Sequence, residues 1–238
     1  MSFSVIDSLK KTLMVKPHPA GVPFIAVGAI AAALFLSVSK FLFAVFFIFT
    51  IFCLYFFRDP VRVTPTKSSL VVSPGDGLVS AIDGDVMLPA EIRGDDTGRY
   101  TRISIFLSVL DVHVNRIPIA SAVMKKIYKP GKFLNAELDK ASEENERCSV
   151  LLKTAEGRTL CLVQIAGLIA RRIVNDLKEG QSVAAGSRYG IIRFGSRVDL
   201  YIPDGVAPLV CVGQRAVGGE TVLADFDSRE QARKGTSI

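Results

Sequence analysis

The feature that most restricts the fold is an almost uninterrupted apolar stretch from Pro23 to Phe57. It has about 35 residues, whereas one helix needs about 20 to cross a bilayer, so it is too long for one helix and slightly short for two. A polar break, SVSK at residues 37–40, divides the stretch near its middle. The pattern therefore predicts a helical hairpin, with helices at about residues 22–38 and 41–57.

The charge distribution associates this hairpin with a membrane. The chain has 29 Lys and Arg against 23 Asp and Glu, and residues 1–70 hold seven of the basic residues but only two of the acidic ones. Three basic residues flank each outer end of the hairpin, which places both ends on the cytoplasmic side of the cell membrane by the positive-inside rule. Because the positive excess flanks the apolar stretch, it indicates anionic lipid and not nucleic acid as the partner.

Other placements of the hairpin stay open. It could rest in one leaflet without crossing, or it could be a buried hairpin of a soluble protein. A secretory signal fits less well, since Lys40 interrupts the stretch and no small-residue cleavage site follows it. We expect a membrane-associated unit at residues 1–62 and a second domain at residues 63–238.

After the hairpin the chain changes to short runs of Val, Ile, Leu and Phe separated by Gly and Pro, a pattern typical of β-strands. The predicted strands are residues 69–72, 78–82, 101–107, 112–117, 120–128, 150–153, 159–166, 189–194, 197–202, 208–212 and 221–224. Short helices are predicted near residues 135–144 and 169–177. The fold class is therefore mainly β (α+β), a sandwich- or barrel-like domain behind an apolar helical hairpin.

Cysteine and histidine usage argues against a metal site. The four cysteines form no CxxC pair and are expected to be reduced, as in a cytosolic setting. Histidine occurs only at His18 and His113, which is too few for a zinc site with several ligands at the usual spacing.

Three polar segments are candidates for chemistry, although each has an ordinary structural interpretation. The run SPGDG at residues 73–77 is a turn whose Asp76 would bond nearby backbone. In DVHVNRIP at residues 111–118, strand alternation puts Asp111, His113 and Asn115 on one face. Gly195-Ser196 lies between two strand-like runs, where a strained bond is plausible.

Two further segments show that a single short motif is weak evidence for function in this chain. A second Gly-Ser pair, Gly186-Ser187, lies in a Gly- and Ala-rich turn, so a Gly-Ser pair alone carries little information. The turns around residues 180–186 and 212–219 are similar to the hairpins of biotinyl and lipoyl carrier modules. Without further support, they are turns with no function.

Four sequence segments taken together are far more specific than any one of them. SPGDG, DVHVNRIP, YKPGKFLNAELDKASEENER and IIRFGSRVDLYIP occur in this order. With them, the chain from about residue 15 to about residue 225, including the apolar hairpin and the RDP after it, closely resembles the short bacterial and archaeal form of the phosphatidylserine decarboxylase family.

The resemblance implies a proenzyme that makes its own cofactor. Ser196 would attack the Gly195 carbonyl, and elimination would convert Ser196 into a pyruvoyl group. The products are a β chain, 1–195, and an α chain, 196–238, which stay together as a heterodimer that could form a higher oligomer. An Asp76–His113–Ser196 relay would activate the hydroxyl, with the aspartate orienting the imidazole.

The implied reaction converts phosphatidylserine into phosphatidylethanolamine in phospholipid biosynthesis. The substrate amine forms a Schiff base on the pyruvoyl group, CO₂ leaves, and His113 returns the proton. A membrane hairpin suits a substrate that stays in the bilayer. No metal is implied.

The chain departs from the long form of the family at two positions. Arg116 stands where the long form has a second histidine, and Arg197 stands where it has a threonine after the cleavage serine. Both changes match the short form. Arg116 either binds the lipid phosphate or carboxylate or is structural.

Two other functions compete with this interpretation. A pyruvoyl decarboxylase of a soluble amino acid would not need the hairpin. A membrane-anchored carrier module would need a modified lysine at a hairpin tip and would stay uncleaved, but the Met124-Lys125 step falls in the middle of a predicted strand.

Overall fold

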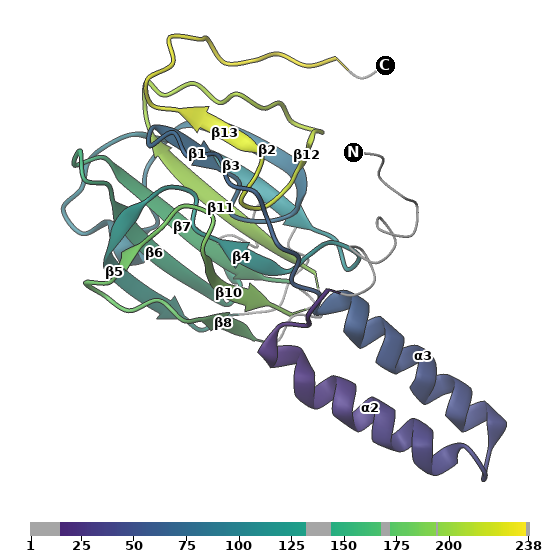
Figure 1. Cartoon of the computed structure of the whole chain (residues 1–238). Helices are drawn as coiled ribbons and strands as arrows, with labels where there is room; N and C mark the ends of the chain where they lie inside the picture. The colour runs from purple at the N-terminus through teal and green to yellow at the C-terminus, as the bar shows by residue number, and fades with distance from the viewer. Residues whose placement is uncertain (1–14, 132–143, 168–171, 194, 237–238) are drawn as a thin grey trace. The chain divides into compact units, whose positions relative to one another are not determined.

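The predicted helical hairpin is present in the computed structural model, which describes residues 15–131, 144–167, 172–193 and 195–236. The chain divides into two compact units, residues 1–61 and 62–238 (Figure 1). The first unit contains a 3₁₀ turn, η1 (Pro19–Gly21), followed by α2 (Val22–Phe35) and α3 (Lys40–Phe56).

The two helices of the first unit pack closely against each other. A methyl group placed on Gly28 of α2 would lie 2.5 Å from Thr50 Oγ1 of α3, so only glycine allows this approach. The rings of Phe35 and Phe46 stack with their centroids 5.6 Å apart. Ser39 begins α3, because its hydroxyl accepts a hydrogen bond from the Leu42 N–H (3.4 Å).

The first helix of the hairpin is shorter than predicted, since α2 ends at Phe35 and not near residue 38, whereas α3 agrees with the prediction within one residue. Within the part of the chain that the structure describes, no helix is both long and apolar enough to cross a membrane.

The second unit is mainly β, as the sequence predicts, and its strand pairs are antiparallel. Its strands are β1 (Leu70–Val72), β2 (Gly77–Val86), β3 (Tyr100–Leu107), β4 (Val114–Arg116), β5 (Ser121–Lys129), β6 (Arg147–Lys153), β7 (Thr159–Ala166), β8 (Ile173–Asn175), β9 (Ser182–Val183), β10 (Arg188–Ile192), β11 (Ser196–Pro203), β12 (Arg215–Ala216) and β13 (Val222–Asp225). One short helix, α4 (Ala90–Arg93), follows β2.

The strands form one large curled sheet and two small ones (Figure 1). The eight-stranded sheet has the order β12-β2-β3-β11-β7-β6-β5-β9, so β11 lies at its centre between β3 and β7. The small sheets are β4-β10-β8 and β1-β13. The fold class predicted from the sequence is confirmed.

Side chains of the central strand β11 alternate between two cores. Val198 and Leu200 belong to the larger apolar cluster, whereas Tyr201 belongs to a smaller cluster on the other face. Arg197 and Asp199 share the face of Tyr201, where they form a buried ion pair with hydrogen bonds of 2.6 and 2.8 Å. The face of Val198 is also the face of Ser196.

Several predictions about single elements are wrong or fall outside the described residues. Residues 208–212 form no strand and contribute only an isolated bridge between Pro208 and Ala224. The helix predicted at residues 169–177 is contradicted by β8, because Ile173–Asn175 pairs with β10 as a strand. Nearly all of the helix predicted at residues 135–144 lies outside the described residues.

Candidate active site

Ser196, the predicted cleavage residue, is the first residue of β11. It lies opposite Leu107 of β3 and Ala166 of β7, and its side chain is fully buried. Its Oγ has no hydrogen-bond partner in the described part of the chain. Buried hydroxyls are nearly always hydrogen-bonded, so this oxygen is an exception that calls for an explanation.

Gly195, which precedes this serine, has a backbone that other residues avoid. Its φ is +65°, in the left-handed region that favours glycine. A methyl group added here would meet no atom within 4 Å, so the glycine is required by conformation and not by crowding. The carbonyl before Ser196 is therefore presented by an unusual backbone turn at a buried strand end.

His113 is fully buried immediately before β4. Its Nδ1 lies 3.0 Å from the backbone oxygen of Asp111, and because a carbonyl only accepts, Nδ1 carries the proton. The neutral imidazole then has its lone pair on Nε2, the tautomer of a general base. Across the β4–β10 pair, the Ile192 N–H donates to the His113 oxygen (3.5 Å), so the strand that leads to Gly195 passes this histidine.

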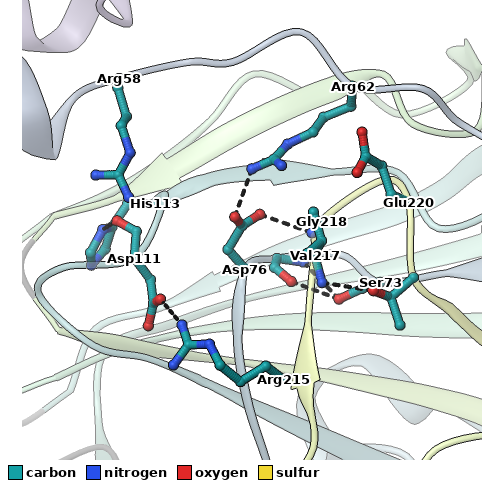
Figure 2. Close-up of polar contacts among 12 residues, drawn as sticks. Arg58, Arg62, Ser73, Asp76, Asp111, His113, Arg215, Val217, Gly218 and Glu220 are labelled. Carbon is teal, nitrogen blue, oxygen red and sulfur yellow. Dashed lines mark hydrogen bonds and ion pairs between the residues drawn. The ribbon is translucent and has the colours of Figure 1, made fainter. Parts of the chain in front are cut away.

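Asp76 lies in a different hydrogen-bonding environment from the one that the relay predicts. Its carboxylate accepts hydrogen bonds from Arg62 Nη2 (2.6 Å) and from the Gly218 N–H (2.8 Å) (Figure 2). Among the described residues these two groups, and not His113, hold the carboxylate. Burial raises the pKa of Asp76, against the opposing effect of the Arg62 charge. The role of Asp76 in the relay stays a prediction.

Asp111 is the carboxylate next to His113 in sequence, and it orients the loop before the histidine. Its oxygens accept hydrogen bonds from the Ser108 N–H (2.9 Å) and the Ser108 hydroxyl (2.7 Å), and it forms an ion pair with Arg215 (Figure 2). The carboxylate therefore fixes the turn whose backbone oxygen holds the imidazole.

Arg116 is buried and linked to the second Gly-Ser turn, because its Nη1 donates to the Gly186 oxygen (2.9 Å). Its backbone N–H donates to the Pro74 oxygen (2.9 Å), which attaches β4 to the SPGDG turn. These contacts give Arg116 a structural role. Its contact with substrate stays a prediction.

Two features of this site do not follow from the sequence patterns. One is the contact of Arg62, a flanking charge of the hairpin, with Asp76. The other is the set of partners of Asn115: Gln164 Nε2 donates to Asn115 Oδ1, and Asn175 Nδ2 donates to Gln164 Oε1, both at 2.8 Å. The amide residues inside apolar strands are a sequence signal for this second feature. Among the described residues, no cluster of His, Cys, Asp and Glu could hold a metal ion.

Comparisons with known proteins identify the family of the chain. A family model for phosphatidylserine decarboxylase matches residues 49–224. A phosphatidylserine decarboxylase proenzyme of Paramagnetospirillum magneticum is 53% identical over 96% of this chain and 94% of its own length. Proenzymes of the same name from Granulibacter bethesdensis and Cereibacter sphaeroides are 51% and 50% identical, over 94% and 98% of this chain and 90% and 99% of their own lengths.

The fold, the buried serine and these relatives define the chain as an enzyme of the decarboxylase class. It belongs to the phosphatidylserine decarboxylase family.

Proposed function

We propose that this enzyme converts phosphatidylserine into phosphatidylethanolamine with a pyruvoyl group that it makes from Ser196. The observation that carries the proposal is the buried Ser196 Oγ, which finds no hydrogen-bond partner among the described residues and directly follows a glycine with positive φ. Together with the family relationship, it supports a serine that is kept for reaction. The residues therefore fit the precursor of a pyruvoyl group.

The proposed self-cleavage begins with a shift of the peptide bond to the serine oxygen. Ser196 Oγ gives its proton to a base and bonds to the Gly195 carbonyl carbon, whose oxygen becomes an oxyanion. The C–N bond then breaks, nitrogen takes up a proton, and Gly195 is linked to Ser196 by an ester. Loss of the Ser196 Cα proton expels the Gly195 carboxylate, and addition of water to the resulting dehydroalanine releases ammonia and leaves the pyruvoyl group.

His113 is the proposed base, because its Nδ1–H is held by the Asp111 oxygen and Nε2 carries the lone pair. Asp76 is the proposed support for the charged imidazole, acting through the field of its carboxylate, since its hydrogen bonds go to Arg62 and Gly218. Burial of this site strengthens such electrostatic effects.

A pyruvoyl group at residue 196 would supply a ketone electrophile for the substrate amine and a conjugated electron sink for the loss of CO₂. His113 Nε2 is the proposed donor of the proton that replaces the carboxylate. Arg116 is a weaker candidate for the lipid phosphate, since its Nη1 already donates to Gly186.

We also propose that the hairpin associates the enzyme with the cell membrane, with its catalytic part on the cytoplasmic side. Val27, Phe41 and Ile48 are 65%, 74% and 65% exposed to solvent, which is costly for apolar side chains in water. The basic residues at both ends of the hairpin would add about 1 kcal/mol each near anionic lipid.

Intact mass measurement of the purified protein tests the proposal. We expect two chains, the smaller beginning at residue 196 with a blocked N-terminus, and a single full-length chain would contradict the pyruvoyl mechanism. The preparation should convert phosphatidylserine in vesicles. Equal conversion of free serine by a protein without the hairpin would favour the soluble decarboxylase instead.

The same measurement addresses the carrier alternative, which requires one uncleaved chain with a modified lysine. Lys125 and Lys126 lie inside β5, paired with Leu151 and Val150 of β6, and not at a hairpin tip. This position argues against a carrier.

A further inference from the structure

Asn115 carries a second buried polar atom for which the described residues provide no partner. The residue is fully buried, and its Nδ2 has no hydrogen-bond partner within the described ranges of the chain. Buried amide groups are rarely left in this state. The proposed function uses Ser196 Oγ but gives Asn115 no role.

The direction of this amide is fixed by a chain of hydrogen bonds that begins on the backbone. The Leu177 N–H can only donate, and it donates to Asn175 Oδ1 (3.1 Å). Asn175 must therefore present its NH₂ to Gln164 Oε1, and Gln164 presents its NH₂ to Asn115 Oδ1, both at 2.8 Å. The last member of the chain then exposes its own NH₂, so the free end is a donor.

The strand register brings this donor to the face of Ser196. Ser196 lies opposite Ala166 of β7, and Gln164 is two residues before Ala166, so its side chain lies on the same face. A methyl group placed on Gly75 would lie 3.4 Å from Asn115 Nδ2 and 3.5 Å from Leu107 Cδ2. Leu107 is the other strand neighbour of Ser196, so the amide donor and this neighbour of the serine border the same small space beside Gly75.

We propose that Asn115 Nδ2 donates a hydrogen bond to the Gly195 carbonyl oxygen as it becomes an oxyanion during self-cleavage. Asn115 is then a catalytic residue of the processing step, and Gln164 is a positioning residue that holds it. The inference rests on the proposed function, which requires this oxyanion but leaves its donor unassigned. A fixed amide in a buried site is suited to the task, because it needs no reorganisation as the charge develops.

The test follows newly synthesised chains by intact mass over time. Replacing Asn115 with leucine, Asn115→Leu, removes the donor with little change in size, and we expect cleavage to slow by about 10² to 10³-fold, the usual cost of one oxyanion donor. Cleavage at the wild-type rate would overturn the inference. Gln164→Leu should slow cleavage less, because Asn115 keeps its NH₂ but loses the bond that orients it.

A matched control and a folding control keep the result interpretable. Ser104 Oγ is also buried without a partner, but Ser104 pairs with Asp199 and lies on the opposite face of β3 from Leu107. Ser104→Ala should therefore cleave normally. If Asn115→Leu unfolds, because Gln164 loses its acceptor, the double variant Asn115→Leu/Gln164→Leu removes both polar groups and should fold yet remain slow.

Hydroxylamine locates the defect within the reaction. It attacks an ester at residue 195, giving a Gly195 hydroxamate and a free Ser196 amine, but leaves a peptide bond intact. Because the proposed donor acts before the ester forms, hydroxylamine should not restore cleavage of Asn115→Leu, and rapid restoration would overturn the assignment. An uncleaved wild-type chain would instead count against the proposed function itself.

Discussion

The two Gly-Ser pairs of this enzyme have the same letters, and each is followed by arginine, but they serve different purposes. Ser187 is in a turn, and its hydroxyl donates to the Ala184 oxygen at 2.6 Å. Ser196 is buried at the start of the central strand, and its hydroxyl has no partner among the described residues. One hydroxyl stabilises its own turn, whereas the other is left available at an energetic cost to the fold.

The two glycines differ in the same way. Both have positive φ, +74° at Gly186 and +65° at Gly195. At Gly186 a methyl group would lie 2.0 Å from Thr64 Oγ1, so packing also excludes a side chain there. At Gly195 the surrounding space is open. A motif of two small residues therefore shows its purpose only through what surrounds it.

The largest expected effect separates the two serines completely. Ser196→Ala should leave the chain at full length and inactive, because no oxygen remains to accept the acyl group. Ser187→Ala should still give two chains by intact mass. If the alanine at position 187 blocks cleavage while the one at 196 does not, the wrong pair has been assigned.

For the two glycines, the larger effect on stability is expected at the pair that is not cleaved. Gly186→Ala should lower the free energy of unfolding by about 3 kcal/mol, from both the contact with Thr64 and the strained backbone. Gly195→Ala should lower it by only about 1 to 2 kcal/mol, from the backbone alone, yet slow cleavage more. Chemical denaturation of both proteins in the uncleavable Ser196→Ala background compares them, and equal losses would contradict the distinction.

The next effect in size concerns the ion pair between Arg62 and Asp76. Arg62→Met removes the charge that opposes the effect of burial on Asp76, so the pKa of Asp76 should rise further. A carboxyl group whose pKa is raised by folding destabilises the protein only while it is ionised. The variant should therefore lose about 2 kcal/mol near pH 7, and the loss should close as the pH falls through the raised pKa.

Denaturation curves at neutral and acidic pH measure this difference, with Lys67→Met as the control. Lys67 also pairs with a carboxylate, Asp225, whose pKa it lowers to about 2, but the lysine is half exposed. Its contribution should be small, within about 1 kcal/mol. A loss for Arg62→Met that persists at acidic pH would show that Asp76 is not its cause.

The smallest effect should come from the hydroxyl of the turn. Ser187→Ala removes the hydrogen bond to Ala184 and should cost about 1 kcal/mol. Thermal unfolding in the Ser196→Ala background should show it as a shift of a few degrees. A shift as large as that of Gly186→Ala would mean that this hydroxyl also supports the packing of the turn.

Much of this fold could be predicted because its long strands are buried and therefore appear in the sequence as runs of apolar residues. Strands β3 and β11 and the apolar hairpin follow directly from patterns in the sequence. The short strands β9 and β12 could not be predicted, since two residues carry no periodicity and pair only because a neighbouring edge is present. The apolar run at residues 208–212 contributes one isolated bridge, between Pro208 and Ala224, and Leu209, Val210 and Cys211 are buried without forming a strand.

The site could be predicted only in part, for a related reason. Gly195, Ser196 and His113 are located by a family pattern within local segments. The hydrogen bonds that arrange them connect distant residues, as Gln164 and Asn115 do across 49 positions. A single sequence does not encode such a pairing in any local pattern, so the amide chain and the Arg62–Asp76 pair emerge only when the strands are in register.

The position of Ser196 at the start of β11 gives the proposed cleavage a consequence for folding. The segment from Ser196 onward supplies β11, β12 and β13, which pair with strands β3, β7, β2 and β1 from before the proposed cut. In a chain cut there, unfolding would release two molecules and refolding would be bimolecular, so the melting temperature should rise with protein concentration. The intact precursor folds as one molecule, so under the proposed mechanism each copy of this enzyme would complete its fold before it acquires its activity.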